Sequence, residues 1–560
     1  MPRRPSLLFL LLCVALAGLA AARRPGAARG PRTAAAFDYD LLIRGGTVVD
    51  GTGASGRRGD VAVSGDRIAA IGDLAGRTAR RVIDAAGLVV APGFIDMLGW
   101  SQYTILVDPR GVSKVTQGVT TELVGEGWSP APVNATTLRE DSVQFAQWGL
   151  AVDWRDLDGY FRRLERSGTP FNLGAFVGAT TLRLYVLGHT HRAPTSAELA
   201  TMVALADTAM RQGAFGVSSA LIYEPGSYAS TAELVALARA AGAHGGLYIS
   251  HIRGEGDGIQ GALDEAFRIG REARVPVEVW HLKASGRQNW GRMPQILALF
   301  DSMRAAGQRV GANSYPYAAS ATGLSQVLPS WAREGGSEAM VRRLRDPATR
   351  ASIRDQMDQP GSVMVLGVLD SALRRYQGRR LGEIARAEGK DPRDVALDIL
   401  VADRGQSGAA YFTMSEADVR TAVATPWIGV GSDFGATAPD GPLAVQPAHP
   451  RAYGTFPRIL GKYVREEHAL TLEAAVHKMT GVPAERVGLR ERGLLREGWF
   501  ADITVFDPAT VADQATFENP HQTSVGVRYV LVNGRLALAA GRLTGERPGR
   551  ALRGPGWSSP

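Results

Sequence analysis

The feature that most constrains the fold of this chain is an alternation of short apolar β-type runs with amphipathic helical patterns between residues 91 and 433. The segment Ser196 to Gln212, for example, repeats apolar residues at the three-to-four spacing of a helix with one buried face. Strands that alternate with helices form parallel sheets, and eight such units close into a TIM-type (β/α)8 barrel. The predicted strand runs of this α/β barrel are Ala91 to Met97, Thr121 to Gly125, Asn172 to Val177, Gly213 to Ser219, Gly246 to His251, Val275 to Lys283, Val310 to Tyr317 and Trp427 to Asp433.

Short strand patterns with glycine turns flank this region on both sides, as in D-V-A-V-S-G-D-R-I-A-A-I-G and V-R-Y-V-L-V-N-G-R. Neither end buries much apolar surface alone. We therefore predict that residues 39–90 and 485–550 pair into one β-sandwich domain, with the barrel, residues 91–484, inserted between them. The interval 324–426 is much longer than a normal connection between barrel units, which predicts an inserted subdomain or lid there.

The first 22 residues have the order of a secretory signal peptide. Arg3 and Arg4 precede a 13-residue apolar run from Leu7 to Leu19, and an alanine-rich stretch follows. A run of this length is too short to span a bilayer, and no later segment looks able to anchor the chain. We predict a signal peptide at 1–22, a flexible linker at 23–38, export to the periplasm or the extracellular space, and no stable membrane anchor.

Charge and cysteine content narrow the classes of function. Residues 1–36 carry six arginines and no acid, so the formal charge of +8 falls to +2 without them. No basic stripe remains that would indicate a nucleic-acid partner. The single cysteine, Cys13, lies in the predicted leader, so a metal would have to be bound by nitrogen and oxygen ligands.

Four predicted strand runs end in or lead into residues that bind metals or transfer protons: Glu126, His251, His281 and Asp433. The carboxyl ends of barrel strands meet at one face, so these side chains are predicted to converge. Two imidazoles and one carboxylate suit a catalytic zinc site that keeps a fourth position for water. We predict Glu126, His251 and His281 as metal ligands and Asp433 as the catalytic residue. The structural alternatives are a solvent-facing Glu126 and an Asp433 that caps a helix.

Further polar residues follow the next strands. Lys283 stands two residues after His281, and Tyr315, Tyr317 and Ser320 follow in Y-P-Y-A-A-S. A lysine with phenolic and hydroxyl donors can hold a substrate carboxylate, which predicts these four as substrate-binding residues. An exposed lysine and tyrosines packed under the lid are the alternative. His189 and His191, in H-T-H, are predicted to be loop residues.

Ten short motifs of the chain, taken together, resemble those of a known family. The chain resembles the metal-dependent amidohydrolase superfamily and, within it, the D-aminoacylases or N-acyl-D-amino-acid deacylases. The resemblance covers about residues 39–556 and rests on A-P-G-F-I-D, T-Q-G-V-T-T-E, I-S-H-I-R-G-E-G, W-H-L-K, Y-P-Y-A-A-S, M-S-E-A-D-V, G-S-D-F-G, H-P-R-A-Y-G-T-F-P-R, A-D-I-T-V-F-D and V-L-V-N-G. It implies a barrel beside a β-sandwich and zinc-assisted hydrolysis of an amide next to a D-amino acid.

By resemblance, His251 and His281 match the ligand histidines, Asp433 the catalytic aspartate, and Lys283 with Y-P-Y the carboxylate-recognising side. Two departures matter. The superfamily usually follows F-I-D with H-x-H, which binds a second metal, whereas this chain has Leu98 and Trp100 there. The family's cysteine ligand is also absent, and Glu126 occupies its place. We therefore expect one zinc ion, with another divalent ion as the alternative.

The sequence predicts a metal-dependent hydrolase of N-acyl-D-amino acids, or of peptides that end in a D-residue, acting on a small-molecule substrate. The D-stereochemistry rests on the resemblance alone. A cyclic-amide hydrolase of the same superfamily is one alternative, although those relatives use two metals. A barrel that binds an acylated amino acid without cleaving it is the alternative from another class. The sequence leaves the oligomeric state open.

Overall fold

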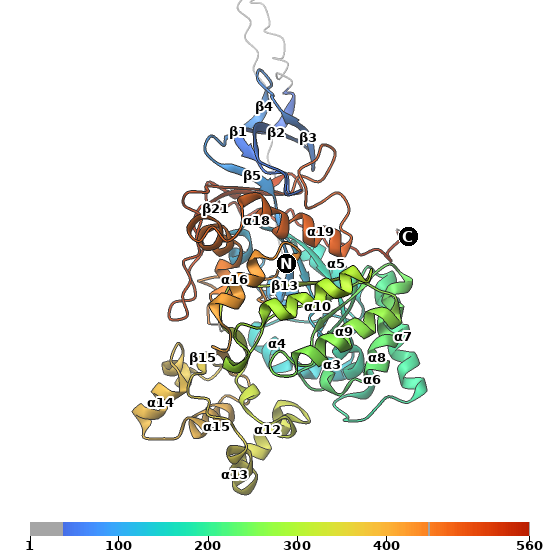
Figure 1. The fold of residues 1–560 in the computed structure, drawn as a ribbon, viewed down its shortest axis with the longest axis vertical. Helices are drawn as coiled ribbons and strands as arrows, with labels where there is room; N and C mark the ends of the chain where they lie inside the picture. Colours follow the sequence, from blue (N-terminus) through green and yellow to red (C-terminus); the bar gives the residue numbers. More distant parts are fainter. Residues whose placement is uncertain (1–36, 446–447, 559–560) are drawn as a thin grey trace, which may run out of the picture.

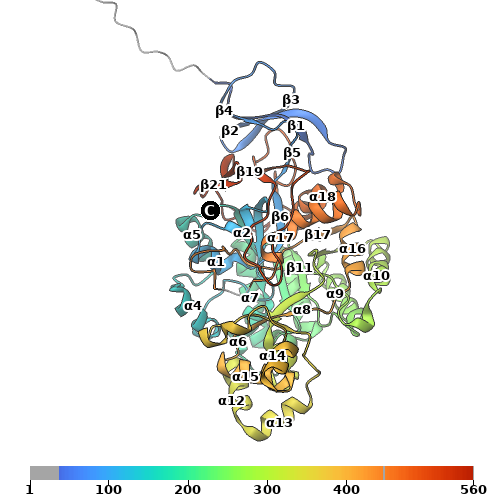
Figure 2. The same ribbon diagram turned by 90° about the vertical axis from the view of Figure 1, so that its left-hand side faces the viewer.

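The computed structural model describes residues 37–445 and 448–558 (Figure 1). The predicted signal peptide, and all but the last two residues of the predicted linker, lie outside this part of the chain. The described residues form a β-sheet domain at one end of the long axis, a barrel in the middle and a small helical subdomain at the other end (Figures 1 and 2). None of the described helices has the length and apolar content needed to cross a membrane.

Eight staves of parallel strands form the barrel in the described part of the chain, as the alternation predicts. One run of strands has the order β6-β7-β8 and the other β17-β13-β12-β11-β10-β9. A parallel bridge between Gly99 and Phe434 joins the first stave to the last. The strands are β6 (Phe94–Gly99), β7 (Val119–Val124), β8 (Asn172–Ala175) with β9 (Val177–Gly178), β10 (Gly216–Ala220), β11 (Leu247–His251), β12 (Val277–Val279), β13 (Val310–Ser314) and β17 (Ile428–Val430).

Amphipathic helices surround the barrel (Figure 2). The helix predicted at Ser196 to Gln212 is α7 (Ser196–Arg211), which buries Met202, Ala206 and Met210. These apolar faces and the strands share the main hydrophobic core, and their burial stabilises the barrel. The other helices around the barrel are α1 (Ser101–Val107), α2 (Val112–Val115), α3 (Ala135–Glu140), α4 (Ser142–Trp148), α5 (Leu157–Ser167), α6 (Ala179–Leu187), α8 (Thr231–Ala243), α9 (Ile259–Ala273), α10 (Met293–Ala305), α16 (Glu416–Ala424), α17 (Arg451–Arg458), α18 (Leu472–Met479) and α19 (Gly481–Val487).

The first predicted barrel strand is two strands in the structure. Residues Val89–Pro92 form β5, which belongs to the sheet domain, and the barrel strand β6 begins at Phe94. Gly93 lies between them, and a Cβ there would sit 2.1 Å from Thr120 Oγ1. Only glycine lets the chain pass this close from one domain into the other.

The two chain ends join in one hydrogen-bonded sheet, as their matching strand patterns predict. Parallel pairing of β5 with β1 and antiparallel pairing of β5 with β18 connect the N-terminal strands to the C-terminal ones. Leu41, Val61, Ile503 and Leu531 lie in the same buried cluster, so the two halves share one core. The strands are β1 (Tyr39–Val48), β2 (Arg57–Ser64), β3 (Arg67–Gly72), β4 (Ala79–Asp84), β5, β18 (Ile503–Phe506), β19 (Val527–Val532), β20 (Arg535–Ala539) and β21 (Arg542–Leu543).

Beyond β21 the C-terminal tail, residues 546–558, runs across the amino-terminal end of the barrel. Its backbone exchanges hydrogen bonds with Leu173, whose N–H donates to the Arg550 carbonyl and whose carbonyl accepts from the Leu552 N–H. The Gly554 N–H donates to the carbonyl of Gly213. The tail therefore adds a strap that no strand pattern in the sequence predicts.

The long interval after the seventh barrel strand contains a subdomain with its own hydrophobic core. Three short antiparallel strands form its sheet: β14 (Ser320–Gly323), β16 (Gly408–Tyr411) and β15 (Met364–Gly367). α16 lies inside the predicted range 324–426 but packs against α10 and β13 of the barrel. The subdomain helices are α11 (Ser330–Arg333), α12 (Gly336–Arg345), α13 (Pro347–Asp355), α14 (Leu381–Glu388) and α15 (Pro392–Ala402).

Candidate metal centre

Three predicted ligands meet at the carboxyl ends of the barrel strands. Glu126 Oε1 lies 2.7 Å from His251 Nδ1 and 2.9 Å from His281 Nε2. The ligand atoms of the three residues lie within 4.8 Å of one another, and all three side chains are buried. The structure thus brings together one carboxylate oxygen and two imidazole nitrogens, contributed by the loop after β7, the end of β11 and the segment after β12.

Local backbone geometry aims these side chains inward. Gly125 and Gly127 flank Glu126 with φ angles of 107° and 69°. A Cβ on Gly127 would approach the Ala220 Cβ to 2.6 Å. A glutamate between two glycines in this setting faces the barrel, and Glu126 is only 2% exposed.

His281 and Asp433 both have a positive φ, 36° and 52° respectively, which is uncommon for residues other than glycine. Each is held by a neighbouring strand. The His281 N–H donates to Asn313 Oδ1 at 2.8 Å, and the Asp433 N–H donates to the Leu98 carbonyl at 2.8 Å. Backbone strain of this kind persists where the surroundings fix it, and it occurs often at functional sites.

The electrostatics of the cluster favour a bound cation. Burial raises the pKa of Glu126, but the charge of His281 and the hydrogen bonds from both histidines outweigh burial and hold that pKa well below its usual value. Burial and Lys283 lower the pKa of His281, yet the carboxylates of Glu126 and Glu255 raise it to about 9. Because a metal binds a deprotonated imidazole nitrogen, a divalent ion between these three donor atoms would displace a proton from His281.

The donor set fits zinc. Two histidine nitrogens and one carboxylate oxygen are ligands that zinc takes in catalytic sites, where a further position stays open for water. A carboxylate in place of a thiolate makes the site harder, which also suits other divalent ions. Within the described residues, no other group of three or more His, Cys, Asp or Glu side chains shares this geometry.

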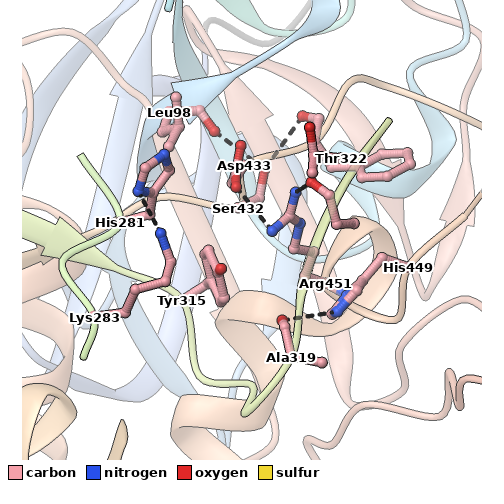
Figure 3. A network of polar contacts seen from close by, with 12 residues as sticks. Leu98, His281, Lys283, Tyr315, Ala319, Thr322, Ser432, Asp433, His449 and Arg451 are labelled. Atoms are coloured by element: carbon pink, nitrogen blue, oxygen red, sulfur yellow. Dashed lines mark hydrogen bonds and ion pairs between the residues drawn. The ribbon is translucent and has the colours of Figure 1, made fainter. Parts of the chain in front are cut away.

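Asp433 lies beside the cluster, after β17 (Figure 3). Its Oδ1 accepts a hydrogen bond from Trp100 Nε1 at 3.2 Å, and its Oδ2 lies 2.8 Å from Arg451 Nη1. Burial raises the pKa of Asp433, and the positive charge of Arg451 opposes this. The carboxyl group is therefore held between an indole N–H and a guanidinium, and it does not cap a helix.

Lys283 is buried behind His281, as Figure 3 shows. Its Nζ lies 2.7 Å from His281 Nδ1 and 2.5 Å from Glu255 Oε1. The same Nζ lies 5.7 Å from the centre of the Tyr315 ring, and the Arg451 guanidinium stacks over that ring at 4.7 Å. Lys283 and Tyr315 therefore both border the centre, although the lysine already has a carboxylate partner.

Tyr317 and Ser320 have other recorded partners than the three ligands, and their substrate-binding roles stay predictions. The Tyr317 hydroxyl donates to Asp513 Oδ2 at 3.2 Å. Ser320 pairs with Tyr411 in the subdomain sheet. Strand β13 ends at Ser314, so the chain turns before Tyr317, and the two tyrosines do not share a strand face.

Three residues of the site were not among the predicted ones: Trp100, Glu255 and Arg451. Glu255 follows His251 by four residues, and Arg451 lies in H-P-R-A-Y-G, so both stand inside quoted motifs. His189 and His191 pair instead with Glu140 at 2.8 Å and with Glu334 at 3.6 Å, as loop residues outside the centre.

Comparisons with known proteins agree with this geometry. The family model described as the amidohydrolase family matches residues 81–537. The chain is 39% identical over 515 residues to a D-aminoacylase of Alcaligenes xylosoxydans xylosoxydans, a match that covers 92% of this chain and 97% of the relative.

Solved structures give the same result. An N-acyl-D-glutamate deacylase from Bordetella bronchiseptica, complexed with zinc and a phosphonate inhibitor that mimics the tetrahedral intermediate, superposes with a TM-score of 0.77 at 36% identity, covering 92% of this chain and 99% of that one. A second structure is that of a D-aminoacylase with a binuclear metal centre, which is described as activated by one metal and attenuated by the second. It gives a TM-score of 0.78 at 37% identity, covering 92% of this chain and 100% of that one.

Proposed function

The chain belongs to the amidohydrolase family, and we propose that within it the protein is a metal-dependent hydrolase that cleaves the amide bond of N-acyl-D-amino acids. The observation that carries this proposal is the convergence of Glu126, His251 and His281 at the carboxyl ends of the barrel strands. Preference for the D-enantiomer rests on similarity to the D-aminoacylase and the N-acyl-D-glutamate deacylase.

We further propose that the centre takes one zinc ion. When bound, the ion supplies Lewis-acid polarisation of the amide carbonyl and makes a water molecule more acidic. The relative with a binuclear centre has a second metal, but Leu98 and Trp100 offer this chain no ligand at the H-x-H position of the superfamily.

Asp433 acts as the general base and acid. It takes the proton of the attacking water while the carbon–oxygen bond forms, and returns a proton to the amide nitrogen as the carbon–nitrogen bond breaks. The products are a carboxylate and a free D-amino acid. Burial raises the pKa of Asp433 from its ordinary value toward neutral pH, which is the direction that this double role favours.

Arg451 and Tyr315 are the residues that we propose to bind the substrate α-carboxylate. Arg451 is buried, and its Nε has no hydrogen-bond partner among the described residues. A buried guanidinium with a free donor is well suited to a carboxylate. Lys283 Nζ lies 5.7 Å from the centre of the same Tyr315 ring, so a carboxylate bound beside Tyr315 would lie near two cations.

The test is metal analysis of the purified protein, followed by hydrolysis assays with matched N-acetyl-D and N-acetyl-L amino acids that carry acidic and apolar side chains. We expect about one ion per chain and cleavage of D-substrates only. A metal-free protein that binds these compounds without cleaving them would support the binding-protein alternative, and turnover of hydantoins or dihydropyrimidines in their place would support the cyclic-amide alternative.

Substitution of a ligand gives a second test. His281→Ala removes one of the two imidazoles, and the remaining pair of ligands should lose the ion and all measurable turnover. His244→Ala is the matched control, because His244 pairs with Asp207 at the end of α8, outside the centre. An H281A protein that keeps both its metal and its activity would contradict the ligand assignment.

We also propose that the protein is exported, on the strength of the charged, apolar and alanine-rich order of residues 1–22. Fractionation of expressing cells should find the mature chain outside the cytoplasm, with an N-terminus close to residue 23. Full-length protein retained in the cytoplasm would contradict this.

A further inference from the structure

A second carboxylate, Glu255, faces the two histidine ligands from the side opposite Glu126. Glu255 lies in the loop between β11 and α9. Its Oε1 is 3.0 Å from His281 Nδ1 and 3.7 Å from His251 Nε2, and it is 2.5 Å from Lys283 Nζ. Glu255 thus faces His251 Nε2 and His281 Nδ1, whereas Glu126 faces the other nitrogen of each ring.

The loop that carries Glu255 is held from several directions. The Ser285 N–H donates to the Glu255 carbonyl at 2.7 Å, which ties the loop to the segment after β12. Two residues earlier, Arg253 forms an ion pair with Glu265 at 2.8 Å and donates to the carbonyls of Ser227 and Ala229. The position of the Glu255 carboxylate is therefore set by the structure on both sides.

His281 Nδ1 has two charged neighbours with opposite requirements. The Lys283 ammonium can only donate a hydrogen bond, whereas the Glu255 carboxylate can only accept one. If Nδ1 accepts from Lys283, the ring proton of the neutral imidazole sits on Nε2 and blocks the lone pair that points at Glu126. If Nδ1–H donates to Glu255, Nε2 is free to bind a metal.

We propose that Glu255 is a positioning residue that fixes the metal-binding tautomer of His281 and, less directly, the orientation of His251. Lys283 donates to Glu255 and balances its charge, so the ammonium does not compete for Nδ1. This inference rests on the proposed function, since it assumes a divalent ion at Glu126, His251 and His281. Carboxylates behind ligand histidines act in this way in metalloenzymes generally.

The test compares two substitutions in the same ion pair, Glu255→Gln and Lys283→Met, with zinc affinity as the readout. Zinc dissociation constants are measured by competition with a chelator, and the cobalt-substituted proteins are compared by visible absorption. We expect E255Q to bind zinc about 10- to 100-fold more weakly and to alter the cobalt spectrum. K283M should keep the wild-type affinity within a few-fold, because Glu255 still accepts from Nδ1.

Glu233→Gln is the matched control, since Glu233 is also a buried carboxylate in an ion pair, with Arg183 at 2.7 Å, but does not face a ligand histidine. Thermal unfolding of the metal-free proteins establishes that each variant is folded. Equal losses of zinc affinity in E255Q and K283M would show that the ion pair is merely structural and would overturn the inference, as would wild-type affinity in E255Q. Wild-type protein that binds zinc but cleaves no N-acyl-D-amino acid would reject the proposed function and leave this comparison readable.

Discussion

Trp100 stands where the second histidine of the superfamily's H-x-H pair would lie, and it contributes a hydrogen bond in place of a metal ligand. Its indole N–H donates to Asp433 Oδ1, on the side of the carboxylate opposite the Arg451 contact. An N–H donor cannot bind a cation, but it fixes the direction of the catalytic carboxylate at no cost in extra positive charge. In the proposed mechanism, Trp100 therefore occupies the position of a metal ligand and helps to place the general base.

Trp100→Phe tests this link. The substitution keeps an aromatic ring and removes the N–H, and we expect kcat to fall about tenfold, which corresponds to about 1.4 kcal/mol, while KM and metal content stay unchanged. Trp290→Phe is the control, because Trp290 is exposed and its N–H donates to the Thr413 carbonyl. An unchanged kcat, or uptake of a second ion by W100F, would contradict the proposed role.

At the residue scale, the functional side chains at the ends of strands could be predicted from the sequence, whereas some of those elsewhere could not. His251, His281 and Asp433 follow apolar runs, so their meeting at one face follows from the parallel barrel. Glu255 lies on a loop, and Arg451 is the first residue of α17, which follows a long loop; no local pattern specifies the path of either loop. Tyr317 was predicted to bind substrate because it stands in N-S-Y-P-Y-A-A-S at the end of a strand run, but β13 ends at Ser314, so the alternation of strand faces does not extend to it.

At the scale of single elements, β12 shows how a short strand carries two functions. Its carboxyl end leads to His281, while Glu278, in the middle of β12, is buried with Arg486 of α19 at 3.1 Å. The fit is close, since a Cβ on Gly311 of β13 would lie 2.3 Å from Glu278 Oε1. Burial raises the pKa of Glu278 to about 7, against the opposing charge of Arg486.

This shift predicts how stability depends on pH. Between the unfolded pKa of 4.5 and the folded value of about 7, the folded state binds more protons, so the contribution of Glu278 is largest at low pH and is lost as pH rises through 7. Glu278→Gln, which stays neutral, should gain about 2 kcal/mol relative to wild type between pH 5 and pH 8. Thermal unfolding of both proteins across that range measures this difference, and a constant difference would contradict the assigned pKa.

Element boundaries were less predictable than element types. The eight strand runs and α7 correspond to elements of the structure, because periodicity reports which face is buried. The join between β5 and β6 was not visible, since Val89–Pro92 and Phe94–Gly99 are both apolar and only Gly93 separates them. Whether a strand belongs to the sheet or to the barrel depends on its distant partner, here β18 or β7.

At the scale of the whole molecule, the C-terminal tail connects the end of the sheet domain to the amino-terminal end of the barrel. Four of its backbone hydrogen bonds, to Thr169, Leu173 (two) and Gly213, span the amino-terminal end of the barrel. A Cβ on Gly554 would lie 2.3 Å from the Ala214 carbonyl oxygen, so the tail lies flat against the barrel. Nothing in its composition distinguishes the segment 546–558 from a surface loop, which is why the sequence did not predict it.

Removal of residues 546–560 should therefore destabilise a barrel whose active site is at the opposite end. At about 1 kcal/mol for each lost hydrogen bond, we expect a loss of about 4 kcal/mol and a lower Tm, without a change in metal stoichiometry in the protein that remains folded. Deletion of residues 559–560 alone leaves the four bonds in place and serves as the control. A truncated protein that unfolds at the wild-type Tm would contradict the role given to the tail.

The pairing of β5 with β18 also bears on how the chain is made. Strand β5 leaves the ribosome about 400 residues before its partner, because the barrel and the subdomain are encoded between them. At usual rates of translation this is a delay on the order of 20 to 80 seconds, during which the sheet formed by the first five strands has an unpaired edge at β5. Nascent chains should therefore depend on a chaperone that covers exposed strand edges, and slow synthesis should favour aggregation over completion of the sheet.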